Sequence, residues 1–463
     1  MSSKNHIHFE ISERKVLLRI IDIAVVIGTL YLVGSVFDLS YFKINDQRWL
    51  WSIVLAVYLF FFANVFELYD LQKASRIMIS LRSVIYTASM TALIYLLTPF
   101  LTPELPENRL QILYFFLAIL VSLLAWRAVY IKFFASSRFN KRIVIVADAA
   151  DALSVVANLE EADPNVEIEG YINTDQTKFV VDQDGLTLLT RSDAQKMISN
   201  NQVSELIIAS ENVDGITPEL YAWLMDLLER GFSVREYTQV YEEMTERVPV
   251  SYVGRDFYRY FPFARSNHNQ LYRVYHRAFD IVVAILGLAI GLVLFPLILL
   301  GNLIGNRGSL LYTQERVGRN RKLFQIIKYR TMVKDAESDG AQFTKKRDVR
   351  ITPFGKFLRK TRLDEFPQFW NILMGDMSVI GPRPERPIFV EVLTKKIPFY
   401  ETRHIVKPGL TGWAQVKADY GESDEQHLKK LQYDLYYIKK RSIFLDIRIL
   451  VKTLSTVVFF KGQ

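Results

Sequence analysis

The chain of 463 residues contains no cysteine, which excludes disulfide bonds, thiolate catalysis and cysteine-ligated zinc or iron–sulfur sites. Its six histidines do not have the spacing of a metal-ligand set, so a histidine-based metal centre is not expected. Glycine is missing from the turn 147–152, which follows a strand that the sequence predicts. A dinucleotide site needs glycines at such a turn, because they let the backbone approach the pyrophosphate.

Hydrophobic and basic residues are plentiful instead. Half of the residues are hydrophobic and the formal net charge is +8, with a mean hydropathy of +0.11. The positive charge is concentrated in the segment 321–365, which has 13 lysines or arginines and 6 acidic residues. A basic segment in a lipid-associated protein favours anionic headgroups or phosphate substrates, and it favours nucleic acid less.

Four apolar segments lie in the first 140 residues, at 20–39, 49–66, 77–100 and 110–134. Each has about the ~20 residues that a bilayer core requires, so residues 1–140 are predicted to form a bundle of four transmembrane helices. The first segment lacks a cleavage site of small residues and is interpreted as a retained anchor. Lysines and arginines flank the bundle so that the N-terminus and everything after 134 are predicted to be cytoplasmic.

Residues 141–262 have a different pattern. Short strand-like runs at 141–146 and 203–209 alternate with helical patterns at 149–161, 192–200 and 218–230. This alternation predicts a Rossmann-like α/β module with a parallel sheet. Because the turn 147–152 has no glycine, a regulatory or scaffolding role is favoured over cofactor binding.

The segment 276–305 is apolar again and is long enough to span a bilayer. Pro296 in its middle breaks or bends a helix, and both flanks are basic. A re-entrant helix that enters and leaves by the cytoplasmic face satisfies both features, whereas a fifth spanning helix kinked at Pro296 is the alternative. The last third of the chain, 306–463, is predicted to be mixed α+β, with an interfacial amphipathic helix at 443–460.

Two adjacent carboxylates, Asp364 and Glu365, lie in the basic stretch. Pro367 suits the first turn of a helix and Gly375 its end, which places Asp364 near a helix N-terminus that favours negative charge. Neighbours on a helix point about 100° apart, so the pair does not form a face-sharing acid/base couple. One carboxylate as nucleophile and the other as metal ligand fits better, although a simple helix cap is the plain alternative.

Arg383 lies between two prolines in the segment 381–385. Proline on both sides restricts the backbone and lowers the entropy lost when the loop is ordered, and a guanidinium held in this way can bind a phosphate bidentately. Lys328 follows a strand-like run at 323–327 and could face the same phosphates. The loop 407–415 ends near Trp413 and is interpreted either as a nucleotide-contacting loop or as a membrane-interface anchor.

Together these segments resemble the bacterial sugar transferase family, the polyprenyl-phosphate hexose-1-phosphate transferases, in the larger form that serves exopolysaccharide, capsule and O-antigen assembly. The matching segments occur in order within 272–463: Tyr312-Thr-Gln-Glu-Arg-Val-Gly-Arg-Asn320, Lys328-Tyr-Arg-Thr-Met332, Arg359-Lys-Thr-Arg-Leu-Asp-Glu-Phe-Pro-Gln368, Trp370-Asn371, Gly375-Asp-Met-Ser378, Gly381-Pro-Arg-Pro-Glu385 and Lys407-Pro-Gly-Leu-Thr-Gly-Trp-Ala-Gln415. The family often has Ser-Pro at the break of its re-entrant helix, where this chain has Phe295-Pro296.

The resemblance implies a reaction. Asp364 would attack the β-phosphorus of a UDP-sugar, expel UMP and carry a phospho-sugar that undecaprenyl phosphate then takes. Glu365 would hold Mg²⁺, which neutralises the departing phosphate. The substrate-binding positions that the resemblance implies are Lys328, Arg359, Arg383, Pro384 and Glu385.

The resemblance also implies a place in the cell and partners. The catalytic domain would lie on the cytoplasmic face of the bacterial inner membrane, in contact with its lipids and not with nucleic acid, and a homodimer is plausible for the family. Two other functions stay open: a membrane-anchored ligand-sensing or scaffold protein, and an NAD-dependent sugar-modifying enzyme that acts through 141–250. The sugar itself is not specified.

Overall fold

The computed structural model describes residues 11–37, 39, 49–69, 77–133, 141–163, 166–174, 186–210, 216–250, 270–306, 308–334, 336, 348–418, 421 and 423–458. The chain divides into two compact units, Met1–Val240 and Tyr241–Gln463. Each unit is described by itself.

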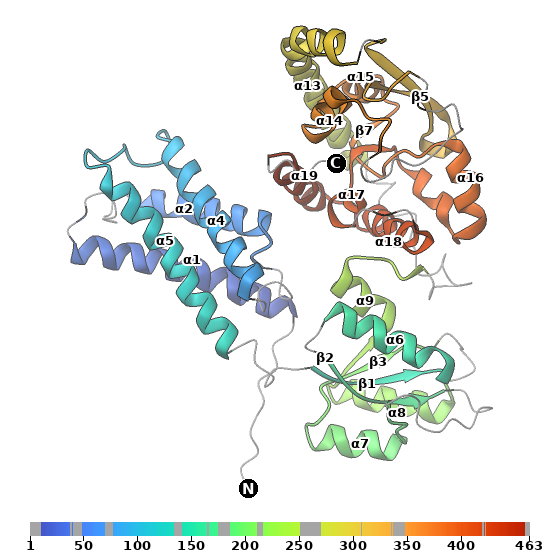
Figure 1. Cartoon of the computed structure of the whole chain (residues 1–463). Helices are drawn as coiled ribbons and strands as arrows, with labels where there is room; N and C mark the ends of the chain where they lie inside the picture. Colours follow the sequence, from blue (N-terminus) through green and yellow to red (C-terminus); the bar gives the residue numbers. More distant parts are fainter. Residues whose placement is uncertain are drawn as a thin grey trace. The chain divides into compact units, whose positions relative to one another are not determined.

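The first unit begins with four apolar helices: α1 (Ile11–Val36), α2 (Trp49–Val65), α4 (Ile77–Leu97) and α5 (Leu110–Phe133). Helix α1 packs on α5, α2 on α4, and α4 on α5 (Figure 1). Aliphatic side chains such as Leu59, Val84 and Leu123 fill the space between them, whereas Leu32, Val57 and Val121 are exposed on the outside. Such outward apolar faces are what a lipid environment stabilises, and the predicted four apolar helices are confirmed.

Asp22 of α1 and Arg127 of α5 form an ion pair inside this bundle. The Arg127 Nη2 atom lies 2.7 Å from Asp22 Oδ2, and the two residues are almost completely buried. An unpaired charge in apolar surroundings costs several kcal/mol, so each of the two residues requires the other. The pair therefore fixes the register of α1 against α5.

The α/β module follows, with β1 (Lys141–Ala147), β2 (Val166–Asn173), β3 (Glu205–Ile208) and β4 (Ser233–Glu236). The four strands are parallel, in the order β2-β1-β3-β4, and are accompanied by α6 (Ala149–Ala162), α7 (Arg191–Ser199) and α8 (Pro218–Glu229). The predicted strands at 141–146 and 203–209 and the three predicted helices are present. Strands β2 and β4 were not predicted, although β2 has in part the polar–apolar alternation of a half-buried strand; β4 has only four residues.

The carboxyl end of this sheet carries a carboxylate where a dinucleotide fold holds a phosphate. Asp148 follows β1 at the N-terminus of α6 and makes no capping hydrogen bond there. Its Oδ1 atom instead accepts from the Thr174 hydroxyl and from the Ser210 hydroxyl at 3.3 Å. A carboxylate at this position would repel a phosphate group.

The second unit contains a β-hairpin, a two-stranded parallel sheet and several helices. Strands β5 (Leu311–Val317) and β6 (Leu323–Tyr329) are antiparallel, and β7 (Ser378–Ile380) pairs in parallel with β8 (Gly409–Thr411). The helices that surround them in Figure 1 are α13 (Gln270–Gly305), α14 (Pro353–Lys360), α15 (Gln368–Met374), α16 (Pro387–Lys396), α17 (Trp413–Lys417), α18 (Asp424–Lys440) and α19 (Ile443–Val458), and α9 (Tyr237–Thr245) crosses the boundary between the units. This mixture is the α+β arrangement that the sequence predicts for 306–463.

Helix α13 is assigned as a single helix through Pro296. One face packs on phenylalanines of the catalytic unit: a Cβ atom at Gly287 would lie 2.4 Å from the Phe369 ring, and one at Gly301 would lie 2.3 Å from the Phe354 ring. Apolar side chains on the other face are exposed, for example Leu292, Val293, Leu297 and Leu300. The glycines therefore allow close packing on one side, and the other side is suited to lipid.

Trp413 lies in the core of the second unit. The sequence left two roles open for the loop 407–415, which contains this residue. Its side chain is fully buried, and the cations of Lys417, Arg448 and Lys452 lie 5.0 to 5.4 Å from its ring. A fully buried indole does not reach a bilayer surface. Trp413 is therefore a core residue and not a membrane-interface anchor.

Replacing Arg127 by leucine is expected to destabilise the helix bundle by about 3 kcal/mol or more, because Asp22 would remain buried without its counter-charge. Thermal unfolding of the detergent-solubilised protein, followed by circular dichroism, measures the effect. The double variant Asp22→Leu/Arg127→Leu should recover most of the loss. Equal instability of the single and double variants would contradict this role of the pair.

Candidate active site

The two adjacent carboxylates lie in a tight turn between α14 and α15. Arg362 has a left-handed backbone conformation (φ 59°) and begins a 3₁₀ turn at Leu363–Glu365. Non-glycine residues adopt this conformation uncommonly, and such strained positions concentrate at functional sites. Helix α15 ends at the left-handed Gly375, as predicted, but it starts at Gln368. Asp364 therefore lies in the 3₁₀ turn that precedes the helix, and not at the N-cap that the sequence predicts.

Glu365 is buried and is held by two arginines. Its Oε1 atom accepts from both terminal nitrogens of Arg383 at 3.3 Å, and its Oε2 atom lies 3.4 Å from Arg362 Nη1. Burial alone would raise the pKa of Glu365, but Arg383 and its other cationic neighbours lower it to about 2. Glu365 is thus a permanent anion that fixes the Arg383 guanidinium.

Asp364 is also buried, with 9% of its surface exposed, but its surroundings differ. Its Oδ1 atom has no hydrogen-bond partner. Burial, followed by the charge of Glu365, raises the pKa of Asp364 to about 6, although Lys328 and Arg359 act in the opposite direction. A buried carboxylate oxygen without a partner is costly for stability and chemically available, which is what a nucleophile requires.

Lys328, near the end of β6, contributes a cation to the same place. Burial, followed by the charge of Arg383, lowers the pKa of Lys328 to about 8, while Glu365 and Asp364 favour its protonated form. Asn371 of α15 secures this strand: its Nδ2 donates to the Gln325 carbonyl at 2.8 Å and its Oδ1 accepts from the Ile327 amide at 3.1 Å. Asn371 therefore makes the hydrogen bonds to the backbone of β6 that a neighbouring strand would otherwise make, and in this way it fixes the position of Lys328.

Arg359, in the last turn of α14, completes the group of cations. Its Nε donates to the Thr331 hydroxyl at 2.9 Å. Burial lowers the pKa of Arg359, whereas the charges of Asp364 and Asp348 raise it. Lys328, Arg359 and Arg383 come from three different segments, and the fold brings all three to the carboxylate pair, as the sequence predicts.

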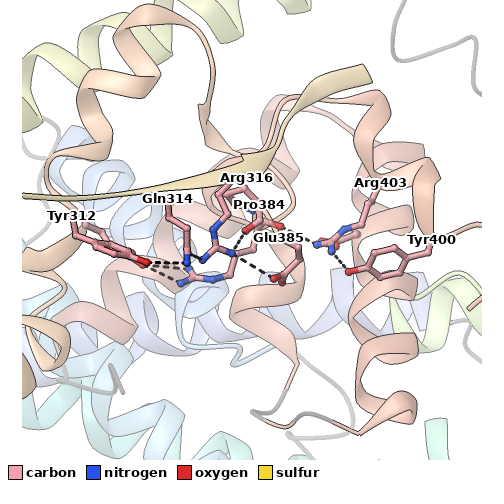
Figure 2. Close-up of polar contacts among 10 residues, drawn as sticks. Tyr312, Gln314, Arg316, Pro384, Glu385, Tyr400 and Arg403 are labelled. Carbon is pink, nitrogen blue, oxygen red and sulfur yellow. Dashed lines mark hydrogen bonds and ion pairs between the residues drawn. The ribbon is translucent and has the colours of Figure 1, made fainter. Parts of the chain in front are cut away.

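Two other predicted substrate-binding residues, Pro384 and Glu385, lie differently. The Pro384 carbonyl accepts from Arg316 Nη1 at 3.0 Å, and a Glu385 carboxylate oxygen lies 3.7 Å from the same nitrogen (Figure 2). Pro384 and Glu385 therefore both contact Arg316, which lies beside the loop 381–385. Their described contacts support the loop, and a direct contact with substrate remains a prediction.

Sequence reasoning did not assign Arg316, Arg362, Asn371 or Arg403 to the site. Arg316 and Asn371 belong to the family-like segments, so a signal for them was present. Arg362 lies two residues before Asp364 and belongs to another of these segments. Arg403 carried no signal, because its contact with the Arg383 carbonyl, at 3.1 Å, joins residues 20 positions apart.

Glu365 was predicted as a ligand of Mg²⁺, and its surroundings agree with this in part. Magnesium in phosphate-transferring sites is commonly bound by one or two carboxylates together with substrate phosphates. Asp364 and Glu365 provide adjacent carboxylates, and the Asp364 Oδ1 atom is unpartnered. Both Glu365 oxygens contact arginines, so the substrate or the ion would have to replace one of these contacts. No cluster of three possible metal ligands occurs among the described residues.

The charges of the site sum to an excess of cations. Four positively charged side chains, those of Lys328, Arg359, Arg362 and Arg383, act on two carboxylates. Guanidinium groups bind phosphate oxygens with well-defined geometry. The site is therefore suited to a substrate with two or more negative charges.

Comparison with known proteins agrees with this geometry. Residues 271–460 match the family described as bacterial sugar transferase, and residues 64–211 match a family described as CoA-binding domain. The first match contains every candidate site residue. The second includes part of the apolar bundle and most of the α/β module.

Three relatives illustrate the similarity. A UDP-N-acetylgalactosamine-undecaprenyl-phosphate N-acetylgalactosaminephosphotransferase of Aeromonas hydrophila is 35% identical over 257 residues, which are 55% of this chain and 59% of the relative. A UDP-glucose:undecaprenyl-phosphate glucose-1-phosphate transferase of Xanthomonas campestris pv. campestris is 43% identical over 178 residues, 37% of this chain and 36% of the relative. A putative undecaprenyl-phosphate N-acetylgalactosaminyl 1-phosphate transferase of Bacillus subtilis (strain 168) is 44% identical over 141 residues, 30% of this chain and 79% of the relative.

These matches define the class of the protein. The chain belongs to the bacterial sugar transferase family, as its sequence motifs predict. It covers 59% and 36% of the lengths of the first two relatives.

Replacing Asn371 by alanine is expected to leave the Ile327 amide and the Gln325 carbonyl unsatisfied, at a cost of about 1–3 kcal/mol for each group. The melting temperature of the purified protein should fall accordingly. Asn371→Asp keeps the acceptor for the Ile327 amide but loses the donor to the Gln325 carbonyl and buries a charge. This variant is therefore also expected to melt at a lower temperature than the wild type. An unchanged melting temperature for Asn371→Ala would contradict the proposed support of β6.

Proposed function

We propose that the protein transfers a hexose-1-phosphate from a UDP-sugar to undecaprenyl phosphate and releases UMP, which begins the assembly of a polysaccharide repeat unit. The observation that carries this proposal is the unpartnered, buried oxygen of Asp364, surrounded by cations from three segments. The family membership and the activities for which the three relatives are named support it.

In the first step Asp364 Oδ1 attacks the β-phosphorus of the UDP-sugar. A bond forms between this oxygen and phosphorus, and the bond from the β-phosphorus to the bridging oxygen breaks, so UMP leaves with the electron pair. The product is an acyl phosphate of Asp364 that carries the sugar. In the second step a phosphate oxygen of undecaprenyl phosphate attacks the same phosphorus, the bond to Asp364 breaks, and a lipid diphosphosugar forms.

The cations stabilise the charge that develops in both steps. Phosphoryl transfer is catalysed mainly by positioning and by electrostatic stabilisation of the phosphate oxygens. Arg383 is oriented by Glu365 and Arg359 by Thr331, so both are fixed before the substrate arrives. The charges of Glu365 and Asp364 favour the protonated form of Lys328. This cation is suited to bind the β-phosphate.

Magnesium, when bound by Glu365 and by phosphate oxygens of the substrate, would neutralise charge on the departing UMP. The residues of this chain supply the nucleophile and the groups that bind the substrate. Asp364 supplies the nucleophile, and the arginines hold the diphosphate. Burial of the turn excludes water, which would otherwise hydrolyse an acyl phosphate.

Contacts of α13 support a re-entrant placement at one membrane face. Near its start the Tyr272 hydroxyl donates to Asp446 of α19 at 2.7 Å. Near its end the Asn302 side chain donates to the Gly308 carbonyl at 2.9 Å, and Asn306 donates to the Arg330 carbonyl at 2.7 Å. Both ends therefore contact one folded unit, which a helix that crossed a bilayer completely would place on opposite sides.

The side of the membrane follows from the substrates and the flanking charges. A soluble nucleotide sugar and a lipid phosphate meet at a cytoplasmic surface, and the lysines and arginines that flank the bundle favour the same side. We therefore place the site at the cytoplasmic face of the bacterial inner membrane. A homodimer is part of the same proposal and is tested by the mass of the detergent-solubilised particle.

Asp364→Asn is expected to lower UMP release by at least about 10³-fold, because the amide cannot act as the nucleophile. The assay uses the full-length protein in lipid nanodiscs with undecaprenyl phosphate, Mg²⁺ and a panel of UDP-sugars that includes UDP-glucose and UDP-N-acetylgalactosamine. Asp424→Asn is the matched control, since its carboxylate is exposed and pairs with Lys396. Undiminished UMP release by Asp364→Asn would refute the assignment.

The covalent intermediate has a separate test. After incubation with a UDP-sugar alone, mass spectrometry under conditions that preserve acyl phosphates should find a hexose-phosphate adduct on Asp364. The adduct should disappear when undecaprenyl phosphate is added. Activity in the wild-type protein without any adduct would support direct transfer between the two substrates instead.

The rate should depend on pH with two limbs. Because burial raises the pKa of Asp364 to about 6, the nucleophile is protonated below this pH, and kcat/KM should fall about tenfold per pH unit there. Because the pKa of Lys328 is lowered to about 8, the cation is lost above this pH and the rate should fall again. Lys328→Arg should shift or remove the alkaline limb only, and an acid limb near pH 4 would contradict the raised pKa of Asp364.

A further inference from the structure

The loop that carries Arg383 has an unusual set of hydrogen bonds. Four successive carbonyl groups each accept one: Pro382 from the Gly409 amide at 2.9 Å, Arg383 from the Arg403 Nη2 atom at 3.1 Å, Pro384 from the Arg316 Nη1 atom at 3.0 Å, and Glu385 from the Val317 amide at 3.0 Å. The first and last donors are backbone amides of neighbouring strands. The two central donors are guanidinium groups.

The prolines explain why side chains are required here. Pro382 and Pro384 have no N–H group, so the loop cannot form a regular ladder with either neighbouring strand. Both prolines are buried, and a buried carbonyl without a partner is costly. An arginine provides several donors in a rigid fork at the end of a long side chain, which suits it to reach carbonyls that no amide can reach.

The two arginines are themselves held in place. Arg403 donates to the Tyr400 hydroxyl at 2.6 Å and to the Asp434 carboxylate at 2.7 Å. Arg316 donates to the Gln314 side chain at 2.6 Å, and that side chain donates to the Tyr312 hydroxyl at 3.0 Å. Figure 2 shows both arginines directed at the loop from opposite sides.

Both arginines are less exposed than the arginine of the loop. Arg403 is 6% exposed, and 16% of the Arg316 side chain is exposed. By contrast, 42% of the Arg383 side chain is exposed, where it contacts Glu365. Arg316 and Arg403 donate to carbonyls of the loop, so a positioning effect is expected to act through the backbone of the loop and through Arg383.

We propose that Arg316 and Arg403 are positioning residues that hold the two central carbonyls of the Pro382–Pro384 loop and thereby place the Arg383 guanidinium beside Asp364 and Glu365. The proposal deepens the proposed transferase function and rests on it for its kinetic consequences. A misplacement of about 1 Å in a catalytic group can lower a rate about 10²-fold. The loop carbonyls link these two arginines to the backbone that carries Arg383.

A double-mutant cycle with Arg383 tests the proposal. Arg316→Met should lower kcat for UMP release by about 10²-fold when Arg383 is present, and by less than about threefold in an Arg383→Ala background, because the group that it positions is then gone. Equal losses in both backgrounds, or less than a threefold loss with Arg383 present, would overturn it. The cycle is repeated with Arg403→Gln/Asp434→Asn, in which the buried carboxylate is neutralised together with the cation so that the core is not left with an unpaired charge.

Arg321→Gln is the matched control. The Arg321 side chain is 59% exposed and pairs with Glu401 at the surface, so its replacement should leave kcat unchanged within about twofold. Melting temperatures of all variants show whether they are folded. A variant that lost activity and also melted far below the wild type would be replaced by Arg316→Lys, which keeps a cation and one donor and should restore most of kcat.

Hydrogen exchange provides a second measurement that does not depend on activity. In Arg316→Met the amides of Gly409 and Val317, which donate to carbonyls of the loop, should exchange at least about tenfold faster than in the wild type, whereas Arg321→Gln should leave them unchanged. Unchanged exchange in Arg316→Met would overturn the positioning role even if the enzyme proved active. If no UDP-sugar yields UMP with the wild-type protein, the transferase proposal fails, while faster exchange would still support the positioning of the loop.

Discussion

The electrostatic balance around the carboxylate pair is the constraint on which the catalytic unit depends. Two adjacent acids in a buried turn cannot both be ionised without compensation, because burial and mutual repulsion each favour protonation. The structure resolves this unequally. Glu365 receives two guanidinium groups and remains an anion, whereas Asp364 keeps an oxygen without a partner. The inequality separates the pair into a residue that orients Arg383 and a residue with an available oxygen, which is the proposed nucleophile.

Much of the second unit brings cations to this turn from distant parts of the chain. The β5–β6 hairpin provides Lys328, α14 provides Arg359, and the proline-flanked loop provides Arg383. Each is secured by a polar group, namely Asn371, Thr331 and Glu365 in the same order. A fixed arrangement of this kind avoids reorganisation when a phosphate binds, which is the main source of electrostatic catalysis.

The apolar parts of the molecule follow a simpler rule. Three of the four N-terminal helices could be predicted within three residues, since length and hydropathy determine a spanning helix, whereas α1 begins nine residues before the predicted segment. Helix α13 could be predicted for the same reason, and its glycines at 287 and 301 allow it to pack closely on Phe369 and Phe354. The α/β module could be predicted only in part, because β2 and β4 are short or polar and acquire their strand conformation from pairing with β1 and β3. Propensity alone does not identify such strands.

The sequence by itself determined the apolar helices and the family, because these depend on local composition and on motifs that follow one another along the chain. The tertiary structure decided how the residues of these motifs are used. It placed Asp364 in a 3₁₀ turn instead of a helix cap, directed Glu365 to two arginines, turned Glu385 towards Arg316, and buried Trp413. It also brought in Arg403, which no motif indicated. These outcomes depend on contacts between residues that are far apart in the chain, and only the packing of the whole unit determines which partners meet.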